Sequence, residues 1–207
     1  MLPGVTPTSS EPSSTVPTAK AVLRAEALAR RDALPAPTRA AAAAAIAASL
    51  DREVLSSLVP GAVIALYAPK GSEVDTAPVV ERALDRDLVV AYPRVTRSDG
   101  NRVLAFHRAR AEDLIRGVFG LHQPHPDAPP ISIADMSVIV VPGIAFDRSG
   151  QRIGWGHGYY DATLGAARSI TSVGLAFTCQ LIPSVPTTPS DVPVQFVITE
   201  DGIVRSP

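Results

Sequence analysis

Hydrophobic positions in this chain fall into short apolar runs that are separated by longer stretches of helix-forming residues. The runs Ala62–Tyr67, Leu88–Ala91 and Val138–Val141 are apolar at almost every position, which is typical of strands buried on both faces of a sheet. Further strands are predicted at Val103–His107, Val173–Phe177 and Val194–Thr199, and helices at Ala19–Leu34, Thr38–Val59, Thr76–Arg86 and Tyr159–Arg168. This alternation predicts an α/β fold: one three-layer αβα domain over residues 19–207, around a central, mostly parallel or mixed sheet.

Residues 1–18 differ from the rest of the chain in composition. They are rich in Pro, Ser and Thr and predict a disordered tail, because they cannot bury enough apolar surface to offset the entropy cost of ordering. Thr18 is predicted to cap the first helix, and Pro35 and Pro37 are predicted to separate it from the second. The tail lacks the apolar centre of a secretory signal, so the predicted location is the cytoplasm.

Composition excludes several classes of function. The formal net charge of -1 argues against a general nucleic-acid binder, which needs a positive field to engage phosphates. No apolar run approaches the roughly 18–20 residues of a membrane span. The single cysteine, Cys179, has no partner for an internal disulfide and is predicted to be a buried structural thiol.

The most informative chemical pattern follows the predicted strand Val138–Val141. The loop behind it ends in a G-W-G-H-G motif at residues 154–158 and leads into the helix that opens with Tyr159. Ligands of α/β sheets bind at the carboxyl ends of strands, and alternating glycines let backbone N–H groups approach an anion closely. The helix N-terminus and the fork of Arg152 both suit a phosphate. The motif is neither a Walker loop nor a dinucleotide fingerprint, so by itself it predicts either a different phosphate site or an ordinary turn.

The whole segment Pro142–Leu164, PGIAFDRSGQRIGWGHGYYDATL, resembles the signature of the 5-formyltetrahydrofolate cyclo-ligase family. The resemblance covers most of residues 19–207, including the strand-loop AVIALYAPKGSEVDT, the AYPRV segment and the closing SDVPVQFVITEDG. It implies ATP- and Mg²⁺-dependent conversion of 5-formyltetrahydrofolate to 5,10-methenyltetrahydrofolate, with release of ADP and phosphate. It also implies a scaffold similar to the NagB/RpiA/CoA-transferase-like fold.

An ATP site is the first consequence of this resemblance. Lys20 and Arg24 are four residues apart and share one helix face, where like charges repel unless an anion lies between them. On sequence alone a solvated face explains them too, and that is our interpretation of Arg30 and Arg31. The resemblance implies that Lys20, Arg24 and Arg152 contact ATP phosphates and act as the catalytic cations. The other ATP contacts that it implies are Gly154, Trp155, Gly156, His157, Gly158, Tyr159 and Tyr160.

A folate site is the second consequence. Glu73 follows a strand, where its carboxylate suits the amino and ring N–H groups of a pterin, although a helix N-terminal acid is the alternative. Tyr67 and Phe119 are further candidates for the pocket, and core packing is the alternative for Phe119. The resemblance places Trp155, Gly156, His157, Gly158 and Tyr159 against the folate as well.

Asp161 and Asp191 are the predicted Mg²⁺ ligands, because the resemblance matches both and carboxylate oxygens suit this ion. An isolated Asp is otherwise a helix cap or a surface charge. His122 and His125 have no third evident ligand, so a zinc site is not predicted there. We expect a monomer that binds two small substrates, without nucleic-acid or membrane partners.

Three positions depart from the family pattern: Trp155, His157 and Gln195. They leave the predicted reaction intact and concern the finer binding contacts. Two rival functions stay open. One is a family paralogue, linked to thiamine metabolism, that binds folate or nucleotide without cyclo-ligase turnover. The other is a sugar-phosphate isomerase or acyl-CoA-type enzyme, for which Glu73 is the visible candidate base.

Overall fold

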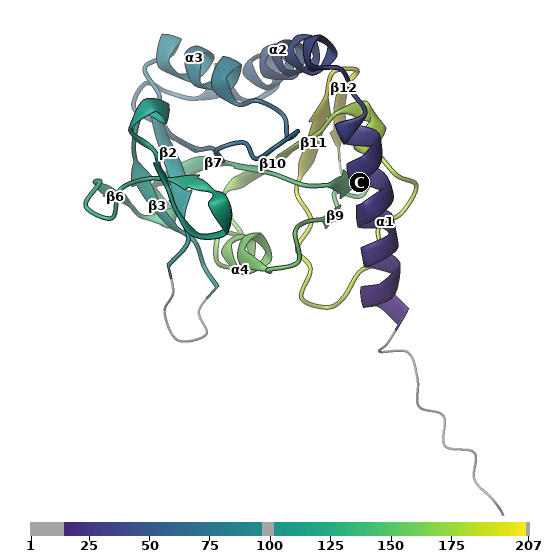
Figure 1. Cartoon of the computed structure of the whole chain (residues 1–207). Coiled ribbons are helices and arrows are strands. Elements are labelled where there is room, and N and C mark those ends of the chain that lie inside the picture. Colours follow the sequence, from purple (N-terminus) through teal and green to yellow (C-terminus); the bar gives the residue numbers. More distant parts are fainter. Residues whose placement is uncertain (1–14, 97–101, 206–207) are drawn as a thin grey trace, which may run out of the picture.

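A computed structural model of the chain describes residues 15–96 and 102–205, so most of the predicted tail, residues 1–14, lies outside the described residues (Figure 1). The helices are α1 (Thr15–Asp32), α2 (Ala36–Glu53), α3 (Ala77–Asp85) and α4 (Tyr159–Ala166). Short 3₁₀ turns η1 to η5 lie at Leu55–Ser57, Ala111–Asp113, Val118–Gly120, Ile133–Asp135 and Thr178–Gln180. None of the helices in these two ranges is long and apolar enough to cross a membrane.

The helices surround an eight-stranded sheet whose centre is parallel. The strand order is β12-β11-β10-β7-β1-β2-β3-β6. Strands β11 to β2 pair in parallel along this order, and β12, β3 and β6 are antiparallel at the two ends. Their bounds are β1 Val63–Ala65, β2 Val89–Arg94, β3 Ala105–Arg108, β6 Pro130–Ile131, β7 Met136–Val141, β10 Thr171–Leu175, β11 Phe196–Thr199 and β12 Gly202–Arg205. The mostly parallel sheet flanked by helices confirms the predicted α/β class.

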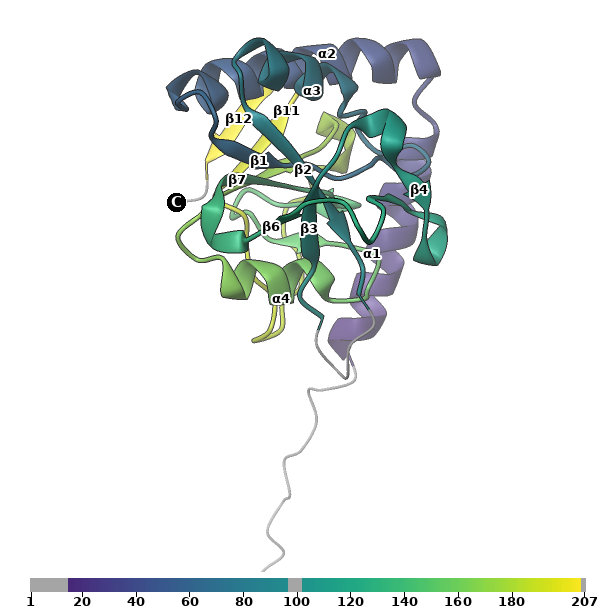
Figure 2. The ribbon, with the colours of Figure 1, turned by 90° about the vertical axis from the view of Figure 1, so that its left-hand side faces the viewer.

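Both faces of the parallel strands are covered, which explains why the strand segments are apolar at consecutive positions. In β1, Ile64 packs into the cluster under α2 and α3, whereas Val63 and Ala65 pack into the cluster on the α4 face. Figure 2 shows α2 and α3 over one face of the sheet and α4 below the other. Helix α1 packs elsewhere, against η5 and strand β8 (Ala145–Phe146), where Ala27 and Ile144 belong to a third cluster.

The first two helices begin earlier than predicted, for one shared reason. Helix α1 begins at Thr15, so Thr18 lies inside it and the prediction of Thr18 as N-cap is wrong. Pro17 lies in the first turn of α1, and Pro37 lies in the first turn of α2. Proline is tolerated at these positions because the first N–H groups of a helix have no intrahelical partner.

Several short strands do not follow from the sequence pattern. Strands β8 and β9 (Arg152–Ile153) form a hairpin inside the predicted loop before α4. A second hairpin joins β4 (Ile115–Arg116) and β5 (His122–Gln123). Strands of two residues are too short for hydrophobic alternation to reveal them.

Candidate functional site

The glycine-rich loop begins at the carboxyl end of β7, a central strand, as predicted. After the β8–β9 hairpin the chain passes through residues 154–158 and enters α4 at Tyr159. Gly156 and Gly158 have φ values of 92° and 72°, a region that other residues rarely occupy. Helix α1 contacts this loop directly, because Arg24 Nε donates a hydrogen bond to the Gly154 carbonyl oxygen at 2.8 Å.

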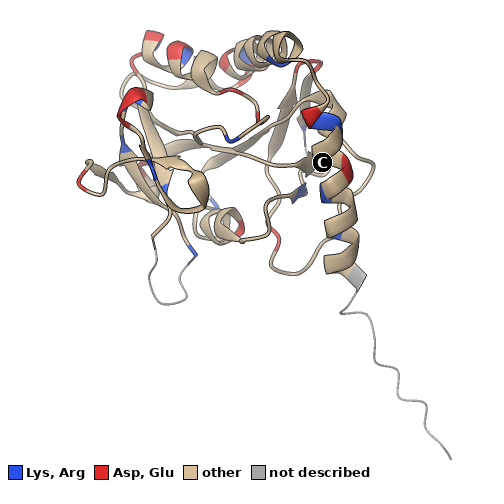
Figure 3. Ribbon diagram, viewed as in Figure 1, with Lys and Arg blue, Asp and Glu red and all other residues tan. Residues whose placement is uncertain are grey.

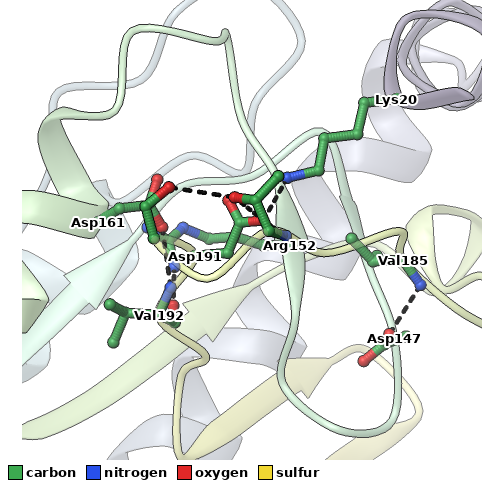
Figure 4. Close-up of polar contacts among 9 residues, drawn as sticks. Lys20, Asp147, Arg152, Asp161, Val185, Asp191 and Val192 are labelled. Atoms are coloured by element: carbon green, nitrogen blue, oxygen red, sulfur yellow. Dashed lines mark hydrogen bonds and ion pairs between the residues drawn. The ribbon is translucent and has the colours of Figure 1, made fainter. Parts of the chain in front are cut away.

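Arg152 is held on the inner side of this loop by two acceptors. Its side chain is almost fully buried, with Nη1 donating to the Val192 carbonyl at 2.5 Å and Nη2 donating to Asp161 Oδ1 at 2.9 Å (Figure 4). Burial lowers the pKa of the guanidinium, and the nearby Asp161 carboxylate opposes that shift. Arg152 therefore provides a fixed positive charge between β9, α4 and the segment before β11.

Lys20 reaches the same place from α1. Its Nζ lies 2.5 Å from Asp191 Oδ2, and both side chains are mostly buried (Figure 4). Burial raises the pKa of Asp191, but hydrogen bonds from Lys20 and Thr188 outweigh that effect and hold the pKa below its usual value. The structure thus brings five predicted residues together: Lys20, Arg24, Arg152, Asp161 and Asp191.

Asp161 and Asp191 each contact a basic side chain in this arrangement. Among the described residues, no group of three or more His, Cys, Asp or Glu is placed to hold a metal ion. Mg²⁺, however, usually takes only one or two carboxylates and completes its shell with waters and substrate phosphates. The two carboxylates fit an ion that arrives together with phosphates, and their assignment as Mg²⁺ ligands stays a prediction.

Glu73 has both carboxylate oxygens engaged. Oε2 accepts from the Lys70 backbone N–H at 2.9 Å, and Oε1 accepts from Trp155 Nε1 at 3.1 Å. Lys70 Nζ lies 5.0 Å from the centre of the Trp155 ring and donates to the Phe119 carbonyl at 3.0 Å. Burial raises the pKa of Glu73, and the bonds from Lys70 and Trp155 oppose it. The Glu73 carboxylate is therefore already fixed by the Lys70 backbone and the Trp155 indole.

Phe119, His157 and Tyr159 form one aromatic cluster. The ring centres of Phe119 and His157 lie 4.4 Å apart in a stacked arrangement, and Tyr159 lies 6.5 Å from Phe119. Phe119 has a φ of 57°, a left-handed conformation that costs about 1–2 kcal/mol for an L-residue. Such strain is common at functional sites, and the Phe119 ring is exposed.

Tyr67 and Tyr160 lie near Glu73. Tyr67 is buried, and its hydroxyl donates to the Val74 carbonyl at 3.0 Å. Burial and the Glu73 carboxylate raise the pKa of both phenols. The structure therefore places Tyr67 in the core next to the candidate folate site, where its predicted contact with substrate is untested.

Two cavities of about 480 and 610 Å³ lie away from the candidate site, one beside Arg148 and Arg205 and the other between α3 and residues 108–113. Neither is lined by the described residues that the sequence predicts for ATP, folate or Mg²⁺.

Arg31 is the residue near this site that the sequence interpretation placed wrongly. Arg30 is exposed, as predicted, but Arg31 is only 1 % exposed and donates from Nε to Ser72 Oγ at 2.9 Å. At 100° per residue, Arg31 lies within about 20° of the direction of both Lys20 and Arg24. This spacing is the sequence signal that places Arg31 on the same helix face as Lys20 and Arg24. Figure 3 shows the basic positions along α1.

Two other sequence interpretations concern His and Cys residues. His125 Nδ1 lies 3.3 Å from Asp127 Oδ2, and no metal cluster includes His122 or His125 among the described residues. Cys179 is partly buried, and burial raises its pKa, which suits a structural thiol better than a nucleophile.

Gly150 in the β8–β9 turn allows a test of how this loop is docked. A Cβ at Gly150 would lie 2.0 Å from the Val194 carbonyl oxygen, and φ is 78°. We expect Gly150→Ala to lower the free energy of unfolding by about 3 kcal/mol or more, from left-handed strain plus overpacking. Gly61→Ala is the matched control, because its φ is 83° and nothing lies within 4 Å of the added Cβ. It should lose only about 1–2 kcal/mol. If urea unfolding gives the same loss of free energy of unfolding for both variants, the clash at Gly150 is contradicted.

Known proteins resemble this chain over nearly its whole length. The model of the 5-formyltetrahydrofolate cyclo-ligase family matches residues 16–200. The 5-formyltetrahydrofolate cyclo-ligase of Mycolicibacterium smegmatis is 33% identical over 195 residues, which cover 91% of this chain and 97% of the relative. That of Escherichia coli is 28% identical over 143 residues, covering 68% and 79%. The NMR structure of Aquifex aeolicus 5,10-methenyltetrahydrofolate synthetase has a TM-score of 0.74 and 27% identity, covering 90% of this chain and 92% of that one.

Proposed function

This chain belongs to the 5-formyltetrahydrofolate cyclo-ligase family of enzymes, and from that premise we propose that it converts 5-formyltetrahydrofolate to 5,10-methenyltetrahydrofolate. The reaction consumes ATP in the presence of Mg²⁺ and releases ADP and phosphate. The observation that carries the proposal is the grouping of three cations at the candidate site: Arg24 bonds the glycine-rich loop, and Lys20 and Arg152 pair with Asp191 and Asp161. We also propose that the enzyme acts as a monomer in the cytoplasm, as the sequence predicts.

Activation of the formyl oxygen is the chemical need that ATP meets. A formamide carbon is a poor electrophile, and its oxygen is a poor leaving group. The oxygen attacks the γ-phosphorus, ADP leaves, and the resulting imidate phosphate is open to attack by N10 of the folate. N10 loses its proton, the ring closes, and the carbon–oxygen bond breaks with release of phosphate.

The protein needs no covalent nucleophile for this sequence. It must align two substrates and stabilise the charge that develops on the transferred phosphoryl group. Lys20 and Arg24 supply two positive charges from α1, and Arg152 supplies a third from β9. Mg²⁺ held by Asp161 and Asp191 would add charge neutralisation at the phosphates. Glu73 accepts hydrogen bonds from the pterin, and the Phe119–His157 pair stacks against it.

A spectroscopic assay tests this function. Purified protein with 5-formyltetrahydrofolate, Mg²⁺ and ATP should generate the methenyl chromophore, and omission of ATP should abolish it. Absence of an ATP-dependent signal would overturn the proposal. Trp155 is the single tryptophan of the chain, so its fluorescence reports folate binding. If folate changes this fluorescence but no turnover is seen, the non-catalytic paralogue is favoured. Turnover of a sugar phosphate or acyl-CoA without ATP would favour the other rival.

A further inference from the structure

Arg31 is a buried cation at the C-terminal end of α1, beside the loop that carries Glu73. Its Nε donates to Ser72 Oγ at 2.9 Å, and its Nη1 contacts the Gly143 carbonyl oxygen at 3.4 Å. Ser72 Oγ in turn donates to Asp32 Oδ1. Arg31 therefore joins α1 to the two loops that follow the neighbouring central strands β1 and β7.

The two acceptors that the Arg31 side chain contacts, Ser72 Oγ and the Gly143 carbonyl, are neutral. No carboxylate in residues 15–96 and 102–205 forms an ion pair with it. Burying a guanidinium without a paired carboxylate is costly, and an apolar side chain of similar size often serves packing as well or better. Packing alone therefore does not explain a cation here, and its field reaches the acidic groups nearby.

Glu73 is the acidic group of the candidate site that this field reaches. It follows Ser72 directly, so the hydrogen bond from Arg31 to Ser72 restrains the backbone next to the carboxylate. Burial raises the pKa of Glu73, and the positive charges of Arg31 and Lys70 oppose that shift. The groups that act on this carboxylate electrostatically or through hydrogen bonds are Arg31, Lys70, Tyr67, Tyr160 and Trp155.

We infer that Arg31 is a positioning residue of the folate site, which holds the Ser72–Glu73 segment so that Glu73 can accept hydrogen bonds from the pterin. The inference rests on the proposed function for the identity of the ligand. It assigns Arg31 to folate binding and leaves the ATP phosphates to Lys20 and Arg24 on the same face of α1.

Calorimetric binding of 5-formyltetrahydrofolate and of Mg·ATP, each alone and between about pH 5 and 8, tests this inference. Arg31→Met should weaken folate binding about 10–100-fold, the usual loss for a buried charged hydrogen bond. Binding of Mg·ATP should change less than about threefold. Arg30→Met is the matched control: it removes an exposed arginine from the neighbouring position and should change neither affinity.

The pH dependence separates a specific role from general loosening of the fold. Folate affinity should fall as the pH drops through the pKa of Glu73, because the protonated carboxyl loses acceptor capacity. Without the Arg31 charge that pKa rises further, so in Arg31→Met the fall should begin at a higher pH. Arg31→Lys keeps the positive charge, so its folate affinity should begin to fall at the same pH as that of the wild type. At every pH this variant should bind folate more weakly than the wild type does.

Equal weakening of folate and Mg·ATP binding by Arg31→Met, with an unshifted pH profile, would overturn the inference. If Arg31→Met does not fold, Ser72→Ala decides, because it removes the hydroxyl acceptor and keeps the cation. It should weaken folate binding alone, and an unchanged affinity would overturn the inference. These titrations need no turnover, so wild-type protein that binds folate without cyclising it would contradict only the proposed function. Wild-type protein that binds no folate would overturn both.

Discussion

An Arg152→Ala variant is expected to lose turnover by about 10²–10³-fold, the usual effect of removing one preorganised charge stabiliser. Its guanidinium is buried and fixed by Val192 and Asp161, so it needs no reorganisation when charge develops on the transferred phosphoryl group. The measurement is kcat in the methenyl assay at saturating substrates. Unchanged kcat would remove Arg152 from the chemistry.

Loss of a structural contact has to be separated from loss of chemistry in this variant. Arg152→Ala leaves the Asp161 carboxylate without its ion-pair partner, which should lower the free energy of unfolding. Adding Asp161→Asn removes the unpaired charge and should restore part of that stability in thermal melts, without restoring kcat. Recovery of kcat in the double variant would show that Arg152 acts only by neutralising the Asp161 carboxylate.

The central sheet was predictable because its strands are long enough, or apolar enough, to appear as apolar runs in the sequence. The runs at residues 62–67, 88–91 and 138–141 became β1, β2 and β7. Helix starts were less predictable, since Thr18 was expected to cap α1 and Pro37 to precede α2, whereas the first turn of each helix accepts a proline. The β8–β9 hairpin depends on tertiary docking, shown by the hydrogen bond from Val194 N–H to the Gly150 carbonyl, which sequence periodicity does not encode.

The site was predictable where residues share a helix or loop, and less so where partners come from distant segments. The spacing of Lys20 and Arg24 predicts one shared helix face, and both side chains reach the candidate site from α1. The partner of Lys20, Asp191, is 171 residues away, so nothing local predicts their ion pair. Arg31 was misplaced because burial depends on what covers the helix, here the loops that follow β1 and β7.

A Lys20→Met variant is expected to raise the KM for ATP about tenfold or more, because a charge-assisted phosphate contact is lost.

The same variant should also lower the free energy of unfolding at neutral pH, since Asp191 loses its ion-pair partner. The pKa of Asp191 lies below its ordinary value of 3.8 in the folded wild type, so this stabilisation is present above pH 3.8. The stabilisation is lost as the pH falls through the lowered pKa that Asp191 has in the folded protein. The free energies of unfolding of the wild type and Lys20→Met should therefore converge at that low pH. A constant difference at all pH values would contradict the ion pair.

Asp191→Asn tests whether the Asp191 carboxylate ligates Mg²⁺, as the sequence predicts, in addition to pairing with Lys20. If Asp191 only neutralises Lys20, the variant releases the ammonium group, and ATP should bind more tightly with an unchanged Mg²⁺ requirement. If Asp191 also ligates Mg²⁺, as the sequence predicts, ATP should bind more weakly, and the deficit should shrink as Mg²⁺ is raised. Calorimetric titration of ATP at several Mg²⁺ concentrations, without folate, gives the answer independently of turnover. We expect the second outcome, because an ion beside Asp191 would free Lys20 to turn to the phosphates.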